Sequence, residues 1–236
     1  MIMKLMFFLL SLTIMAINAY CGIMPSQSRI IYYEEDKEQS LMLANTNEYP
    51  VIVQTWIDRG EGNPETVSIP FISIPPVFKI EPSDIKGIRI IYNRDKLPSD
   101  KESLFWFNIY EIPPEKKEPN PENSVLITMN TQIKLFFRPK VINTTPEKSV
   151  GKISCNKINK TSIECYNPSL IYLSVINLKI MTEDNKIAKV RENDLILPPL
   201  SNKKLTTDTM DGNINKITIT YINDNGEILE HTLSNR

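Results

Sequence analysis

The chain has 236 residues, with 27 lysines and arginines against 28 aspartates and glutamates, one histidine and three cysteines. This length suits one large domain or two of about 100 residues each, and a 41% hydrophobic content is enough for a packed core. A net charge of -1 disfavours a nucleic-acid binder that relies on a basic surface. The single histidine, His231, excludes multi-histidine metal sites, and no glycine-rich phosphate loop is present.

The first 21 residues have the order of a secretory signal peptide. A short basic start precedes the apolar run Leu5–Ala16, and small or neutral residues follow up to Gly22. Cleavage is expected after Ala19 or after Cys21, and the second site would leave an even number of cysteines in the mature chain. A lipid anchor on Cys21 and a buried N-terminal helix are the alternatives.

The rest of the chain consists of short runs of alternating or β-branched residues separated by turn residues, which is typical of an all-β sandwich. The strands predicted in the first half are Arg29–Tyr33, Ser40–Ala44, Val51–Ile57, Ile88–Tyr92, Leu104–Ile112 and Ser124–Phe137. Those predicted in the second half are Gly151–Cys155, Ser162–Tyr166, Ile171–Ile180, Ile187–Val190, Lys216–Ile222 and Glu227–Leu233.

A turn-rich connection at residues 139–148 separates the two sets of strands. The sequence therefore predicts three segments: a signal peptide at 1–21, an N-terminal β domain at 22–140 and a C-terminal β domain at 141–236.

Four blocks of sequence carry a family resemblance. The longest is LPSDKESLFWFNIYEIP at 97–113, and the others are SRIIY at 28–32, IKLFFRP at 133–139 and YINDNG at 221–226. In order and spacing they resemble the periplasmic chaperones of pilus assembly. This resemblance implies two immunoglobulin-like β-sandwich domains in a boomerang arrangement with a cleft between them, and a location in the periplasm.

The resemblance also implies a non-enzymatic function. Such a chaperone binds pilus subunits that lack their last strand, completes their fold with a strand of its own, and delivers them to an outer-membrane usher. No cofactor, metal, nucleic acid or small-molecule substrate is implied, and self-association of the unloaded protein is a further expectation. The alternatives are a structural pilus or adhesion subunit with immunoglobulin-like domains, and a secreted hydrolase that uses carboxylates.

By the same resemblance, Val125, Ile127 and Met129 are the apolar residues of the donated strand. Alternation along this strand leaves one consistently apolar face, which could equally pack into the protein's own core. Arg29 and Lys134 correspond to two basic residues that bind the subunit's C-terminal carboxylate, the alternative being ordinary surface basicity. Lys134 has the opposite parity to the donor residues, so a bulge or a strand crossing is expected between them.

Glu102, Arg138 and Asp224 match a charged group that the family buries between its domains, although three separate surface charges are possible. Cys155 and Cys165 lie in predicted strands on either side of a turn, so they could face each other across a hairpin. Export to an oxidising compartment favours a disulfide between them over two buried thiols.

Overall fold

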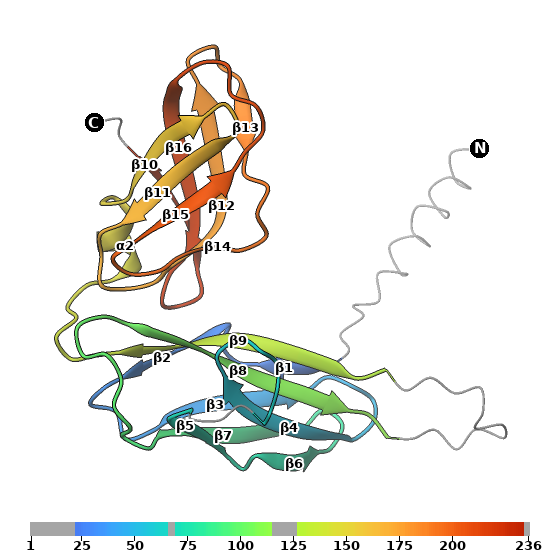
Figure 1. Ribbon diagram of the computed structural model, residues 1–236. Helices are drawn as coiled ribbons and strands as arrows, with labels where there is room; N and C mark the ends of the chain where they lie inside the picture. The colour runs from blue at the N-terminus through green and yellow to red at the C-terminus, as the bar shows by residue number, and fades with distance from the viewer. Residues whose placement is uncertain (1–21, 66–68, 115–126, 234–236) are drawn as a thin grey trace, which may run out of the picture.

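The computed structural model describes residues 22–65, 69–114 and 127–233. The predicted signal segment and Val125 lie outside the described residues. Within them, no helix combines the length and the apolar character needed to cross a membrane. Two β-sandwiches follow one another along the chain and meet at one end, giving the expected boomerang outline (Figure 1).

The N-terminal sandwich contains two sheets, with strand orders β1-β3-β7-β5 and β2-β9-β8-β4-β6. All neighbours are antiparallel except β2 and β9, which are parallel. The strands are β1 (Ile23–Pro25), β2 (Arg29–Tyr33), β3 (Gln39–Asn45), β4 (Val51–Asp58), β5 (Phe71–Ile74), β6 (Val77–Ile80), β7 (Ile85–Tyr92), β8 (Ser103–Ile112) and β9 (Met129–Arg138).

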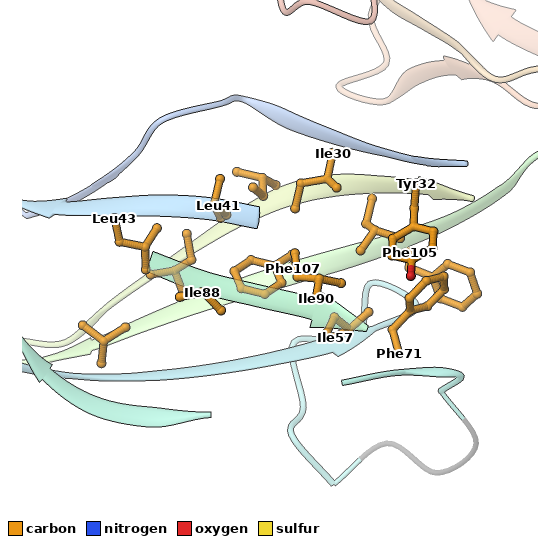
Figure 2. Packing of buried hydrophobic residues seen from close by; sticks show 14 of the residues in the cluster. Ile30, Tyr32, Leu41, Leu43, Ile57, Phe71, Ile88, Ile90, Phe105 and Phe107 are labelled. Carbon is orange, nitrogen blue, oxygen red and sulfur yellow. The ribbon is translucent and has the colours of Figure 1, made fainter. Parts of the chain in front are cut away.

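Alternation along these strands builds the N-terminal core, because every second side chain points between the sheets. Leu41 and Leu43 of β3 are fully buried, and they face Phe105 and Phe107 of β8 across the interior. Figure 2 shows these side chains packed together with Tyr32 and its neighbours between the two layers. The packed core of this sandwich therefore gives strand β9 a rigid support.

The C-terminal sandwich has one sheet in the order β10-β11-β15 and a second in the order β13-β12-β16-β17, with β14 also pairing with β12. A one-turn helix with proline in its first turn precedes them. The elements are α2 (Pro146–Val150), β10 (Ser154–Asn159), β11 (Ser162–Asn167), β12 (Leu173–Thr182), β13 (Ile187–Lys189), β14 (Leu195–Leu197), β15 (Ser201–Thr206), β16 (Ile214–Ile222) and β17 (Ile228–Leu233). Their apolar residues form a second, separate core.

Cys155 and Cys165 are directly opposite each other on β10 and β11, and their sulfur atoms are bonded. Their Cα atoms are 4.0 Å apart, close to the spacing of a non-hydrogen-bonded pair in an antiparallel ladder. The predicted disulfide is confirmed. Closing a loop of this size stabilises a domain by about 2 to 3 kcal/mol. The bridge holds the edge strand β10 on its sheet.

Candidate functional site: the free edge of β9 and the interdomain cleft

Strand β9 has two halves with different neighbours. On one side it pairs with β8, from Met129 opposite Glu111 to Phe137 opposite Ser103. On its other side, β2 pairs only with residues 134–138. Within the part of the chain that the structure describes, residues 129–133 therefore have a strand on one side only. Such an edge presents backbone N–H and C=O groups to any strand that approaches it.

The two faces of β9 also differ. Ile133, Leu135 and Phe137 are buried in the N-terminal core, whereas Lys134 and Arg138 point to the opposite face. The register with β8 runs without a shift from Met129 to Phe137, so the expected bulge is absent over these residues. Met129 therefore lies on the core side of the strand and Lys134 on the opposite side. The strand is regular between them, and the two side chains face different surfaces.

The core-side row of β9 continues beyond the core. Met129 is 49% exposed and Ile127, two residues earlier, is 80% exposed, although both have the parity of the buried Ile133. The alternative that these two side chains pack the protein's own core is therefore wrong. Strand β9 begins at Met129, so Ile127 lies just before it and not inside a strand starting at Ser124 as predicted. Exposed apolar side chains beside a free edge are typical of a binding surface.

Arg29 and Lys134 are directly paired in the parallel ladder between β2 and β9, so their side chains share one face. Arg29 is buried, and its Nη1 donates to the carbonyl oxygen of Ile222, 3.1 Å away. Its Nε is buried without a hydrogen-bond partner among the described residues. Lys134 Nζ lies 5.5 Å from the centre of the Trp106 ring. Both cations thus converge where the two domains meet.

The electrostatics of this pair favour an incoming anion. Burial lowers the pKa of Lys134, and the charge of Arg29 lowers it further, while Asp194 acts in the opposite direction. Burial also lowers the pKa of Arg29, against the opposing charges of Asp224 and Glu102. Two adjacent, partly desolvated cations repel each other, and a carboxylate between them would relieve that repulsion.

A cleft of about 420 Å³ opens beside Lys134 between the two domains. The N-terminal domain contributes Leu104, Trp106 and Lys134 to its wall, and the C-terminal domain contributes Tyr172, Asn193, Asp194, Ile196, Pro198 and Lys203. On the C-terminal side Lys203 forms an ion pair of 2.9 Å with Asp194. The cleft predicted between the domains therefore exists, and Lys134 lines it.

The three charged residues predicted to lie between the domains form one group, in which Glu102 and Arg138 are buried and Asp224 is partly buried. Arg138 Nη2 is 2.8 Å from Glu102 Oε1, and Arg138 Nη1 is 2.6 Å from Asp224 Oδ2. The reading of three separate surface charges is therefore wrong. Burial raises the pKa of Glu102 to about 7, against the attraction of Arg138. Because desolvation offsets much of the attraction, this group is expected to fix the orientation of the domains more than it adds to net stability.

Further contacts join the domains at positions that sequence reasoning did not single out. The amide of Tyr172 donates to Glu102 Oε2 at 2.8 Å, and the amide of Glu102 donates to the carbonyl of Leu170 at 2.9 Å. At Gly226, where φ is +85°, a Cβ atom would lie 2.6 Å from Ser28 Oγ. The Asn-Gly turn was visible in the sequence, but its approach to the other domain was not.

Comparison with known families and proteins agrees with this architecture. Residues 22–143 match the model of the pili and flagellar-assembly chaperone PapD N-terminal domain, and residues 149–233 match the pili assembly chaperone PapD C-terminal domain. The probable fimbrial chaperone YehC of Escherichia coli K12 is 31% identical over 225 residues, covering 94% of this chain and 91% of that protein. The chaperone FocC of Escherichia coli is also 31% identical, covering 90% and 89%.

Solved structures give the same result. The crystal structure of the YadV chaperone superposes with a TM-score of 0.77 at 28% identity, covering 89% of this chain and 98% of that one. The SafB chaperone of Salmonella enterica, solved in complex with the SafA pilin, gives a TM-score of 0.74 at 25% identity, covering 92% and 97%. The two matched domains, the relatives and the shared two-domain β fold together place this chain in the family of pili assembly chaperones.

Proposed function

We propose that this protein is a periplasmic chaperone that captures pilus subunits after export and completes their fold with residues of β9. The observation that carries the proposal is the free backbone edge of the first half of β9, together with the exposed apolar side chains of Met129 at its start and of Ile127 just before it. A subunit groove that lacks one strand needs both features, because backbone hydrogen bonds hold an added strand and alternate side chains fill the groove. Val125 is proposed as a third donor residue.

Arg29 and Lys134 have a separate task in this proposal. They bind the carboxylate at the C-terminus of the subunit and so fix the register of its last strand against β9. Charge-assisted hydrogen bonds from two cations are both strong and directional, which suits the capture of a chain end. The ion-paired group of Glu102, Arg138 and Asp224 keeps the C-terminal domain in position over this site.

Release of the subunit follows from the same physics. The donated strand would be replaced by the better-fitting N-terminal extension of the next subunit at an outer-membrane usher, with no bond made or broken. We propose that the protein performs no catalysis and that subunit and usher are its partners. The relative solved with a pilin supports the first of these partners.

Co-expression is the experiment that tests the proposal. A cognate pilin subunit lacking its N-terminal extension should form a soluble one-to-one complex with this protein, and should aggregate or be degraded without it. Size-exclusion chromatography with light scattering measures the stoichiometry. A subunit that is equally soluble with and without this protein would contradict the proposal. If this protein instead polymerised with other copies of itself through its own termini, the alternative of a structural pilus subunit would gain support.

A further inference from the structure

The free half of β9 carries polar side chains on its cleft side that bond to the sheet behind it. Gln132 Nε2 donates to Asn108 Oδ1 at 2.7 Å, and Asn130 Nδ2 donates to the same oxygen at 3.1 Å. In the register, Asn108 of β8 lies opposite Gln132, and Tyr110, two residues further along β8, lies opposite Asn130. One fully buried amide therefore holds two side chains of the edge strand.

Asn108 is in turn fixed from the third strand. Its Nδ2 donates to Asp58 Oδ2 at 2.9 Å, and Asp58 at the end of β4 is fully buried. The indole Nε1 of Trp56 donates to the same carboxylate oxygen at 3.1 Å, and the amide of Gly60 donates to Oδ1 at 2.8 Å. Buried polar groups that are this well paired act as a rigid unit. The four side chains of Asp58, Asn108, Asn130 and Gln132 are called the amide clamp below.

The position of the amide clamp along β9 suggests its role. Its two members on β9, Asn130 and Gln132, lie in the part of the strand that β2 does not pair with, and none of the clamp's bonds reaches residues 134–138. A strand with one neighbour frays more easily than one with two, because it loses half of its ladder. Side-chain bonds from Asn108 compensate for the missing neighbour at the place where this half of β9 must stay extended.

We propose that Asn108 is a positioning residue, which through the amide clamp holds residues 129–133 of β9 in register as a ready-made edge for an incoming strand. Ordering the edge in advance removes part of the entropic cost of strand addition, so capture becomes faster and tighter. The effect on capture rests on the proposed function, whereas the effect on the edge itself does not.

Amide hydrogen exchange of the unliganded full chain, followed by NMR, tests the clamp directly. The variant Asn130→Ala/Gln132→Ala removes only exposed side chains, so its fold should be retained. We expect the β8-bonded amides of residues 129–133 to exchange about tenfold faster in this variant, with no change at 134–138 or in the C-terminal domain. Asn108→Ala should show the same local pattern more strongly.

Asn167 supplies the matched control. Its amide is also fully buried, and it donates to the carbonyls of Ile171, Leu197 and Pro198 in the C-terminal domain. Asn167→Ala should loosen that domain and leave residues 129–133 unchanged. Unchanged exchange at 129–133 in Asn130→Ala/Gln132→Ala, or equal acceleration throughout the N-terminal domain, would overturn the proposal.

The association rate with a pilin subunit lacking its N-terminal extension gives the second readout. It should fall about tenfold in Asn130→Ala/Gln132→Ala, in step with the faster exchange of the edge. A loosened edge with an unchanged association rate would overturn the positioning role. If the unmodified protein captured no subunit, the proposed function would fail, while the exchange data would still decide whether the clamp orders β9.

Discussion

Replacing Arg29 and Lys134 together with alanine is expected to weaken subunit capture at least a hundredfold while leaving the chaperone folded. Each cation would contribute about 1.5 to 3 kcal/mol through a charge-assisted hydrogen bond to the subunit's carboxylate, and tenfold in affinity corresponds to about 1.4 kcal/mol. The two side chains repel each other in the free protein, so removing them relieves a strain on the unliganded state. Affinity measured by titration calorimetry, with circular dichroism for the fold, checks the expectation.

Two exposed cations of the same domain serve as the control. Lys79 and Arg89 each pair with a glutamate at the surface, so Lys79→Ala/Arg89→Ala removes the same charge and should leave affinity unchanged. Arg29→Met/Lys134→Met retains the apolar stems that pack between the domains and should behave like the alanine pair. Capture at the original affinity by either cleft variant would show that the carboxylate is not bound there.

Replacing Ile127 with aspartate is expected to abolish capture at any concentration that can be tested, a loss of at least a hundredfold. In the proposed complex this side chain enters an apolar groove of the subunit, where an unpaired carboxylate costs several kcal/mol. In the free protein the side chain is 80% exposed, so the same change should leave the melting temperature unaltered. Pull-down of a tagged subunit with each purified variant provides the measurement.

Ile228 gives the matched control for this substitution. It is an isoleucine on β17 of the C-terminal domain and is 65% exposed. Ile228→Asp makes the same chemical change on a surface with no proposed role in strand donation, so capture should persist. Equal losses in the two variants would mean that an exposed isoleucine matters only for solubility, and capture by Ile127→Asp would remove the donor role from this residue.

The sequence was sufficient to predict the all-β class, because alternation is a local pattern. The group of Glu102, Arg138 and Asp224 was predicted from the family resemblance, which rests on the separate blocks at 97–113, 133–139 and 221–226. The sequence also predicted the pairing of Cys155 with Cys165, since a hairpin brings strands of opposite direction together. Strands β1, β5, β6, β14 and β15 were missed. Proline at positions 70, 75 and 76 interrupts the alternation around β5 and β6, and lysines at positions 203 and 204 hide the pattern of β15.

Other features could not be predicted from the sequence, because they depend on where a strand has no packing partner or no neighbouring strand. Alternation assigns Ile127 and Ile133 to the same face of a strand, but only the fold shows that one is exposed and the other buried. The free edge of residues 129–133 depends on where β2 ends, which is a property of sheet pairing. Asn108 lies within the block at 97–113 that carries the family resemblance. Its bonds to Asn130 and Gln132 depend on the register between β8 and β9, which the sequence does not specify.

Hydrogen exchange of β9 in the chaperone–subunit complex tests the central claim most directly. In the free protein, the amides of residues 129–133 that point away from β8 face no other described strand and should exchange rapidly. Addition of a subunit strand at this edge should slow their exchange at least a hundredfold, with little change in the amides already bonded to β8. Rapid exchange of these outward amides in a stable complex would show that the subunit binds elsewhere and that β9 donates no strand.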